Sequence, residues 1–171
     1  MSVADTVKII TTADGSHSLL NETLHETYHS RHGAMQESEY VFIEQGLRYW
    51  LTHNNQHTLN ILEVGLGTAL NAWLTFRLPE VQTRKVNYVA VEKFPLPPPV
   101  WQQLNYAATD RELFERIHAL SWNEWKPVTA QATLFKSEGA LQELDLPPLE
   151  FNLIYFDAFA PNKQPEMWTH D

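Results

Sequence analysis

The chain has 171 residues, of which 43% are hydrophobic and 19% are charged, which is enough apolar material for one globular core. It has no cysteine, and this excludes disulfide bonds and thiolate metal sites. Its formal net charge of -9 argues against a general polyanion binder, although Arg84, Lys85, Arg111 and Arg116 leave room for a local basic patch.

The first third of the chain predicts a β-hairpin followed by an amphipathic helix. In "VKIITTADGSHSLL" two β-rich runs flank an Asp14-Gly15 turn, which is a hairpin signal. In "ESEYVFIEQGLRYWL" apolar residues recur near helical spacing from Val41 to Leu51. The N-terminus carries neither a signal peptide nor an apolar anchor, and no later stretch is apolar enough to span a membrane. We therefore expect a cytoplasmic protein without membrane association.

The rest of the chain alternates predicted strands with predicted helices. Strands are expected at Leu59–Val64, "VNYVAVEKF", Ala130–Phe135 and "FNLIYFDAF". Helices are expected through Trp73 and Phe76 to about Pro79, around Trp101–His118, and at Ala140–Leu144, while "FPLPPPV" reads as a rigid loop. This order predicts a single α/β domain over residues 1–171, with a mostly parallel sheet and helices on its faces.

The predicted alternation stops after Phe156-Asp157, where "APNKQPEMWTHD" follows. Four parallel strands make a thin sheet, and the last one has no helix after it. We expect either that the chain is cut short or that a partner covers this edge, for example a second copy of the chain in a homo-oligomer.

The stretch "ILEVGLGTAL" predicts a buried strand that runs into a tight glycine turn. Gly65 and Gly67 lie where parallel sheets bind ligands, at the carboxyl end of a strand. Leu70 replaces the third glycine of a dinucleotide fingerprint, and no Gly-Lys-Ser/Thr follows. A dinucleotide and a triphosphate are therefore disfavoured.

Two acids near this turn point to a different ligand. Glu63 precedes the turn and suits an ammonium group, and Glu92 ends the next strand, where its two oxygens can accept both hydroxyls of a ribose. A cofactor with an amino-acid tail and a ribose but no phosphate is S-adenosyl-L-methionine. The alternative is an ordinary strand-turn-helix with two solvated acids.

Three segments together resemble the MnmC-like (MnmD-type) tRNA methylaminomethyl-thiouridine methyltransferases: "LEVGLGTALNAWLT", "YHSRHGAMQESEYVFIEQGL" and "IYFDAFAPNKQPEMWT". The resemblance implies a Rossmann-like class I methyltransferase fold with seven strands, of which the last are missing here. It also implies a hairpin and cofactor-closing segment over about residues 1–55, before a Rossmann-like core over about 56–171.

The family transfers a methyl group to the aminomethyl nitrogen of wobble-position 5-aminomethyl-2-thiouridine in tRNA. The resemblance gives Asp157 the role of accepting a hydrogen bond from that nitrogen, and Phe159 and Pro161 would wall the pocket. For Asp157 the alternative role is an acid that caps the next loop. The resemblance also implies an oxidase partner in the pathway, fused to the methyltransferase or separate from it.

The upstream segment of the family closes over the cofactor, so Tyr28 and Ser30 are expected at the cofactor and Glu37 at the substrate. Glu138 lies where an acid often contacts the adenine amine, but "FKSEGAL" departs from the Gly-Asp of many relatives. His25, His29 and His32 have a spacing that three zinc ligands could use. The intervening polar residues favour a loop, and no metal is expected.

Two rival functions stay open at this point. The first is a methyl- or aminopropyltransferase that acts on a small amine, which the acidic composition favours. The second is a non-catalytic fragment of the same fold. Trp168 is also noted as a residue that could stack on a base.

Overall fold

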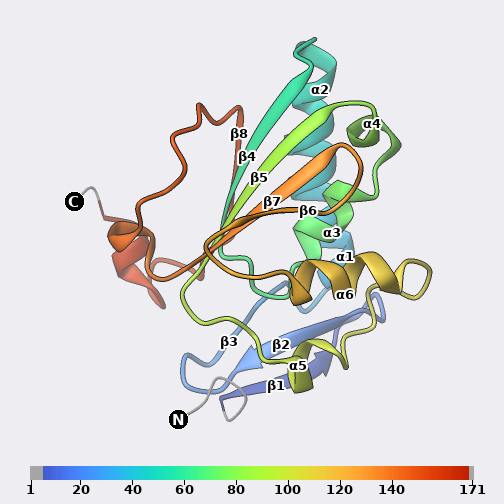
Figure 1. Cartoon of the computed structure of the whole chain (residues 1–171). Helices are drawn as coiled ribbons and strands as arrows, with labels where there is room; N and C mark the ends of the chain where they lie inside the picture. Colours follow the sequence, from blue (N-terminus) through green and yellow to red (C-terminus); the bar gives the residue numbers. More distant parts are fainter. Residues whose placement is uncertain (1–5, 170–171) are drawn as a thin grey trace.

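A five-stranded sheet forms the centre of the protein, whose computed structural model describes residues 6–169 (Figure 1). The strand order is β6-β7-β5-β4-β8. The strands are β4 (Thr58–Val64), β5 (Lys85–Glu92), β6 (Trp125–Pro127), β7 (Ala132–Glu138) and β8 (Leu153–Phe156). The four predicted strands are confirmed as parallel neighbours. The short β6, which runs antiparallel to β7 at the edge, was not predicted because three residues give no readable alternation.

The register of the sheet brings the carboxyl ends of three strands together. Val64 at the end of β4 is paired with Val91 of β5 on one side and with Phe156 of β8 on the other. The chain continues from β4 into Gly65 and from β8 into Asp157. Because parallel strands end at the same edge, segments 92 residues apart in the sequence leave the sheet side by side.

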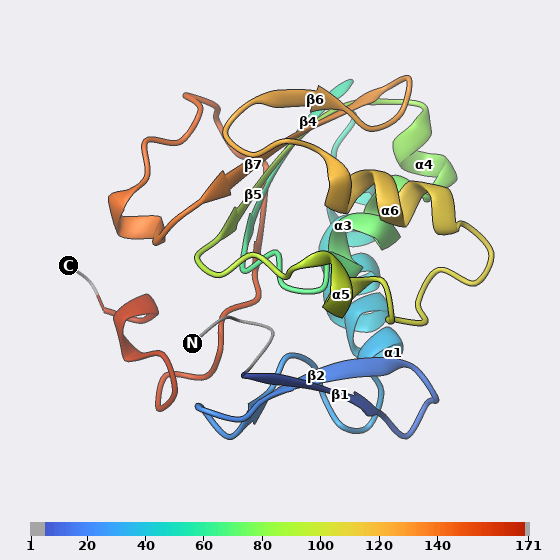
Figure 2. The ribbon, with the colours of Figure 1, turned by 60° about the horizontal axis from the view of Figure 1, so that its bottom comes forward.

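The helices pack on one face of this sheet (Figures 1 and 2). The first is continuous over residues 34–53 and consists of α1 (Ala34–Ser38), the π-helix η2 (Glu39–Arg48) and α2 (Tyr49–His53). The others on this face are α3 (Leu70–Phe76), α4 (Pro79–Gln82) and α6 (Arg111–Ala119). α3 is buried along its whole length, so it forms the centre of the main core.

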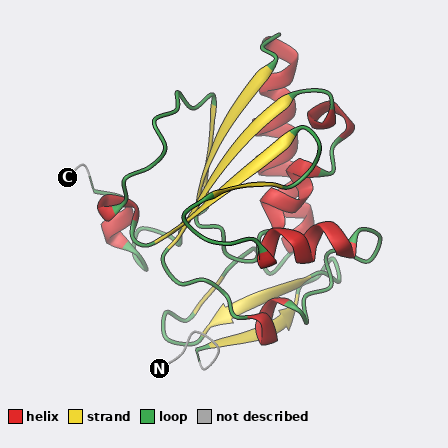
Figure 3. Ribbon diagram, in the orientation of Figure 1, coloured by secondary structure: helices red, strands yellow, loops and turns green. Residues whose placement is uncertain are grey.

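Within residues 6–169 the opposite face of the sheet carries only short 3₁₀ turns, drawn red in Figure 3, so the expectation of helices on the faces of the sheet holds for one face alone. Its apolar side chains Leu62, Val64, Val89 and Val91 form a second, smaller core. The segment 139–151 covers them with leucines and Phe151. The helix predicted at Ala140–Leu144 is only the 3₁₀ turn η3 (Leu141–Glu143), because the prolines at 147 and 148 leave it no room to extend.

The region between β5 and β7 also differs from the prediction. The expected helix around Trp101–His118 is split into α5 (Pro98–Trp101) and α6, which begins only at Arg111. α5 starts inside the proline run that was read as loop, since proline is tolerated in the first turn of a helix.

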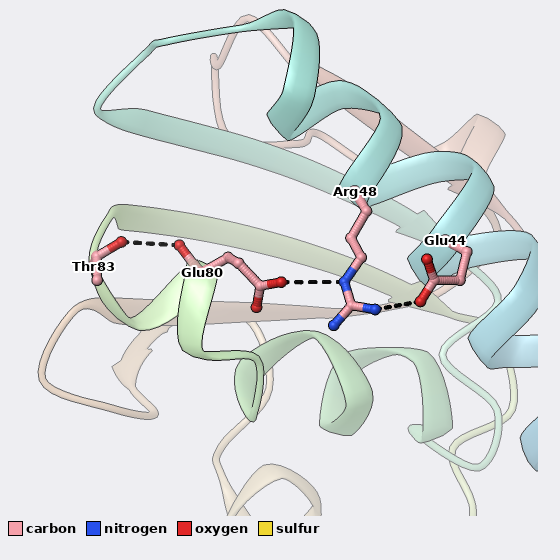
Figure 4. Close-up of polar contacts among 4 residues, drawn as sticks. All are labelled: Glu44, Arg48, Glu80 and Thr83. Carbon is pink, nitrogen blue, oxygen red and sulfur yellow. Dashed lines mark hydrogen bonds and ion pairs between the residues drawn. The ribbon is translucent and has the colours of Figure 1, made fainter.

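Ion pairs connect the long helix to α4 on the outer side of the helical layer (Figure 4). Arg48 reaches Glu44 one turn earlier in η2, and its Nε donates to Oε1 of Glu80 in α4 at 3.2 Å. The hydroxyl of Thr83 donates to the backbone carbonyl of Glu80 at 3.1 Å. These side chains are largely exposed, so they fix orientation more than they add stability.

The predicted N-terminal hairpin is confirmed as β1 (Val7–Thr11) and β2 (His17–Asn21), with the short β3 (Glu26–Thr27) added beside β2. Its turn caps the long helix. Oδ2 of Asp14 accepts from the backbone N–H of Gln36, and Oγ of Ser16 accepts from the first N–H groups of α1. These contacts satisfy helix donors that would otherwise be unpaired. Within residues 6–169 no helix is both long and apolar enough to cross a membrane.

Candidate active site

A cavity of about 840 Å³ opens at the edge of the sheet where β4, β5 and β8 end. Its wall combines parts of the N-terminal segment 21–37, the glycine turn 64–71, residues 91–94 and 139–142, and residues 157–167. Its carboxylates outnumber its amino groups. The acids are Glu26, Glu37, Glu92, Asp157 and Glu166, and the bases are Lys93 and Lys163. The cavity therefore suits a cationic ligand better than an anionic one.

Both glycines of the predicted turn line this cavity, each with a positive φ. Gly65 has φ +92°, and a Cβ there would lie 2.6 Å from the carbonyl oxygen of Asp157. Gly67 has φ +49°, and a Cβ there would lie 3.2 Å from the ring of Tyr28. Close approach of two other segments, together with backbone conformation, therefore requires glycine at both positions.

Glu92 lies in the cavity wall with both carboxylate oxygens on backbone donors. Oε2 accepts from Gly67 at 2.8 Å and Oε1 accepts from Phe94 at 2.8 Å. Burial raises the pKa of Glu92, and these N–H groups counteract part of that rise. A carboxylate has about four acceptor sites, so beside the backbone N–H groups of Phe94, Gly67 and Lys93 there is room for a ligand hydroxyl.

Asp157 faces the cavity directly after β8, and the amide of Asn71 holds it. Nδ2 of Asn71, in the first turn of α3, donates to Oδ2 of Asp157 at 2.8 Å. The pKa of Asp157 is raised to about 7. Burial is the largest cause and the negative charges of Glu37 and Glu92 add to it, while the hydrogen bond from Asn71 acts in the opposite direction. An acid with its pKa near neutrality can accept a proton at physiological pH.

Glu63 lies behind the turn and is not among the residues that line the cavity. It is fully buried, and the hydroxyl of Tyr88 donates to its Oε2 at 2.9 Å. Burial raises the pKa of Glu63 well above its usual range, and the nearby Asp157 raises it further. Direct contact with a ligand's ammonium group, as expected from the sequence, is incompatible with this position.

The N-terminal segment, which the resemblance implied would close over the cofactor, forms part of the cavity wall. Tyr28, Ser30 and Glu37 all line it. The backbone N–H of Ser30 donates to Oε2 of Glu37 at 2.6 Å, which fixes the acid in place. The ring of Tyr28 meets that of Phe159 edge to face, with centroids 5.2 Å apart. The segments that carry Tyr28 and Phe159 thus meet at the cavity.

Besides Glu63, two predicted residues lie outside the cavity wall. Glu138 is exposed at the end of β7, while the following residues, from Gly139 to Gln142, line the cavity in its place. Pro161 is exposed, whereas its neighbours Phe159 and Ala160 form the wall. In both cases a turn of the loop directs the adjacent residue inward.

Among the three histidines, only His29 lines the cavity; His25 and His32 are exposed. His29 lies between the hydroxyls of Ser18 and Thr68, at 3.4 Å from each, and burial lowers its pKa to about 4. No group of three or more metal-ligating side chains occurs within the described part of the chain.

The other residues noted in the sequence also have local partners. The indole of Trp168 donates to the carbonyl oxygen of Phe159 at 2.8 Å and packs edge-on against Phe156. Arg111 and Arg116 pair with glutamates of their own helix. None of the four residues proposed for a basic patch, Arg84, Lys85, Arg111 and Arg116, lines the cavity.

Sequence reasoning missed two residues that shape the site. Asn71 was overlooked, although a buried polar side chain in the apolar stretch "LNAWLTF" is a usable signal for a specific partner. Lys163 was also overlooked. Its Nζ donates to the carbonyl oxygen of Leu24 at 2.9 Å and so ties the last loop to the N-terminal segment, a contact that no sequence pattern encodes.

Comparisons with known proteins agree with this geometry. A family model described as S-adenosyl-L-methionine-dependent methyltransferase matches residues 124–171. The chain is similar to the "tRNA 5-methylaminomethyl-2-thiouridine biosynthesis bifunctional protein MnmC" of Idiomarina loihiensis, with 32% identity over 173 residues that cover 87% of this chain and 27% of that protein. The protein of the same name from Pseudomonas fluorescens is 31% identical over 159 residues, which cover 84% of this chain and 24% of that protein.

A solved structure shows the same architecture. The crystal structure of MnmC2 from Aquifex aeolicus matches with a TM-score of 0.74 and 27% identity, over 95% of this chain and 53% of that chain. The chain thus spans about a quarter of the length of the curated relatives and about half of the solved chain. The predicted Rossmann-like methyltransferase fold is confirmed.

Proposed function

Because the chain belongs to the family of MnmC-like, S-adenosyl-L-methionine-dependent methyltransferases, we propose that it methylates the aminomethyl nitrogen of wobble-position 5-aminomethyl-2-thiouridine in tRNA. One observation carries the proposal. The Asp157 carboxyl, whose pKa is raised to about 7, faces an acidic cavity beside the glycine turn, held there by Asn71.

The residues of the glycine turn and of β5 fit S-adenosyl-L-methionine. Gly65 and Gly67 both line the cavity, so an amino-acid tail bound there can approach their backbone. Glu92 lines the same cavity and keeps acceptor capacity for a ribose hydroxyl beside its backbone donors. When bound, the cofactor supplies an electrophilic methyl group on a positively charged sulfur.

On the substrate side, Asp157 has the chemistry that an alkylamine needs. Such an amine is mostly protonated at neutral pH, and only its neutral form has the lone pair to attack a methyl group. Asp157 accepts a hydrogen bond from the aminium and takes up its proton. A pKa near 7 lets the carboxyl do so and then return the proton to solvent.

The walls around Asp157 support methyl transfer by limiting the access of water. Tyr28 and Phe159 pack edge to face across the cavity, and Lys163 holds their two segments together. With the amine and the methyl donor held in line, orientation supplies much of the rate enhancement, and no covalent enzyme intermediate is needed.

The acidic lining favours a second candidate, transfer to a small polyamine. Glu37, Glu92 and Asp157 would attract such a cation as readily as they attract the aminomethyl group of a nucleoside. The words "tRNA 5-methylaminomethyl-2-thiouridine biosynthesis" in the relatives' name support the tRNA candidate. The word "bifunctional" in the same name supports our expectation of an oxidase partner, fused or separate.

A methylation assay separates the two candidates. Labelled S-adenosyl-L-methionine is offered with tRNA that carries the unmethylated aminomethyl group, with fully modified tRNA, and with polyamines. We expect label only in the first RNA, and its incorporation should be about a hundredfold slower or more when Asp157 is replaced by Asn. Label in polyamines but not in RNA would select the second candidate. Binding of S-adenosylhomocysteine without any transfer would favour a cofactor-binding fragment.

A further inference from the structure

Two acids that line the cavity, Glu37 and Asp157, are held by the protein in the same way. Oε2 of Glu37 accepts from the backbone N–H of Ser30 at 2.6 Å, and Oδ2 of Asp157 accepts from the amide of Asn71 at 2.8 Å. Neither acid forms an ion pair with a described residue. Each carboxylate is therefore fixed at one oxygen, and no ion pair in the described structure balances its charge.

The second oxygen of each acid remains available. No described residue donates a hydrogen bond to Oε1 of Glu37 or to Oδ1 of Asp157. Neither atom is among the buried side-chain atoms that lack a hydrogen-bond partner. Because both residues line the cavity, these two oxygens are accessible to a ligand bound there.

Glu37 and Asp157 reach the cavity from separate elements that pack together. Glu37 lies in α1, which packs against α3, and α3 carries Asn71, the partner of Asp157. Burial is the main cause of the raised pKa of Asp157, and the negative charge of Glu37 adds to it, as expected for neighbouring carboxylates. The cavity thus offers two carboxylate acceptors, one from α1 and one from the loop after β8.

A primary amine has two N–H groups for these two acceptors. Once its extra proton has passed through Asp157 to solvent, the neutral nitrogen keeps two N–H groups and one lone pair, in roughly tetrahedral directions. With one N–H on each carboxylate, the lone pair is left for the methyl group. It forms the new N–C bond while the electrons of the C–S bond return to sulfur, and both carboxylates stabilise the positive charge that develops on nitrogen.

The methylated product cannot repeat this arrangement. A neutral secondary amine has a single N–H group. With its lone pair directed at a second methyl donor, its own methyl group must point at one of the two carboxylates. That carboxylate then loses a hydrogen bond inside the cavity, and an acceptor that is shielded from water and has no donor is costly. The first methyl group therefore blocks a second transfer.

We propose that Glu37 is a specificity-determining residue that forms, together with Asp157, a pair of acceptors which selects a primary amine and limits transfer to one methyl group. The inference rests on the proposed function, because it takes the substrate amine to lie beside Asp157. The names of the similar proteins specify a methylamino group, with one methyl on nitrogen, and a pair of acceptors of this kind agrees with such a product.

The number of methyl groups on the product nitrogen tests the proposal. RNA with the unmethylated aminomethyl group is incubated to complete conversion with excess S-adenosyl-L-methionine, digested to nucleosides and analysed by mass spectrometry. We expect only the monomethylated nucleoside from the wild-type protein. E37L has similar volume but no acceptor, so it should also give the dimethylated nucleoside and should transfer the first methyl group at least about tenfold more slowly.

E37Q tests the same point with almost no change of shape. Its single oxygen stays on the N–H of Ser30, so the amide presents a donor to the substrate amine where Glu37 presents an acceptor. We therefore expect the dimethylated nucleoside from E37Q as well.

E26L is the matched control. Glu26 is another acid of the cavity wall in the same N-terminal segment, and one of its oxygens also accepts a backbone N–H, that of Thr27. Its charge is not among those that raise the pKa of Asp157. E26L should therefore give only the monomethylated nucleoside. Dimethylation by the wild-type protein or by E26L, or a single methyl group from both E37L and E37Q at complete conversion, would overturn the proposal.

These outcomes can be separated from misfolding and from failure of the proposed function. Circular dichroism and the affinity for S-adenosylhomocysteine show whether each variant folds and binds the cofactor product. If the wild-type protein labels polyamines instead of RNA, the tRNA function fails, while the number of methyl groups on each polyamine nitrogen still tests the pair of acceptors. If the wild-type protein methylates no amine, the proposed function and this inference are both refuted.

Discussion

The backbone of Asp157 crosses directly over Gly65, so that a β-carbon on this glycine would lie 2.6 Å from the Asp157 carbonyl oxygen. The glycine turn and the loop that carries the candidate base are thus packed against each other. The sequence argument gave Gly65 a different reason, namely a tight turn at the carboxyl end of a strand, where parallel sheets bind ligands. The structure adds that Gly65 also sets the position of Asp157.

Replacement of Gly65 by Ala is therefore expected to weaken both the fold and the site. A non-glycine residue at φ +92° is strained, and the contact with Asp157 adds to that strain, for a loss of about 1–3 kcal/mol of unfolding free energy. Urea denaturation measures it. The control is Gly46→Ala in η2, where a β-carbon meets only ordinary contacts at 3.6 Å or more. Equal stability of the two variants would remove the special role of Gly65.

Glu92→Gln is expected to weaken the binding of S-adenosylhomocysteine by about 1.5–3 kcal/mol, the cost of losing a hydrogen bond to a charged group. The amide has one oxygen, so it cannot serve both Gly67 and Phe94 as the carboxylate does. Glu138→Gln is the matched control, because Glu138 pairs with Glu92 in register but lies outside the cavity. Isothermal titration measures both. A larger effect at Glu138 would restore its expected role at the adenine.

Asp157→Asn is expected to slow methyl transfer by about a hundredfold or more, because the amide cannot take up the proton of the aminium. Affinity for S-adenosylhomocysteine should change by less than about threefold, since Asp157 faces the substrate. The wild-type rate should rise as the pH increases through about 7, where Asp157 loses its proton. In the variant, the rate should recover partly at high pH, where the amine is already neutral. Near-normal turnover by the Asp157→Asn variant would contradict a catalytic role and indicate that Asp157 only caps its loop.

Asp14→Ala is expected to lower the unfolding free energy by about 1 kcal/mol, as for loss of a helix cap. Burial raises the pKa of Asp14, but hydrogen bonds from Ser16, Gln36 and Thr12 bring it down to about 2. Its folded pKa is thus below its usual 3.8, so its contribution is complete above pH 4 and is lost as the pH falls toward 2.

Asp110 supplies the control for this prediction. It stands at the N-cap position of α6, but its side chain makes no capping hydrogen bond. Asp110→Ala should therefore cost less than Asp14→Ala in the same denaturation assay. The difference between the two variants should shrink as the pH falls toward 2, and a difference of unchanged size there would show that Asp14 acts through packing instead.

Self-association through β8 remains a prediction. Within the described sheet β8 pairs only with β4, and Ile154, which is 57% exposed, stands on it near the exposed Phe156. A bare strand edge with apolar side chains favours pairing with another copy. Sedimentation at rising concentration should show dimers that Ile154→Lys reduces. A wild-type protein that stays monomeric at all concentrations would contradict self-association through β8.

The sequence predicted the parts of the fold that depend on local patterns. Strand runs such as "LNILEV" and the turn at Asp14-Gly15 are local, and the strands were confirmed within a few residues. Parallel sheets bind ligands at the carboxyl ends of their strands, and this rule correctly placed Gly65, Glu92 and Asp157 at one cavity. The failures concern spatial relationships. Nothing local shows that Glu63 turns into the core, or that helices cover only one face of the sheet.

The pairing of β8 with β4 has a consequence for the order in which the protein can fold during synthesis. β4 is made early, yet one of its two neighbours leaves the ribosome only after about ninety more residues have been joined. Until then Glu63 and Val64 have an open flank, and neither Asp157 nor Phe159 exists to complete the cavity. A nascent chain that pauses before β8 thus exposes a strand edge at its centre and cannot hold its ligand, which makes it a natural client for chaperones.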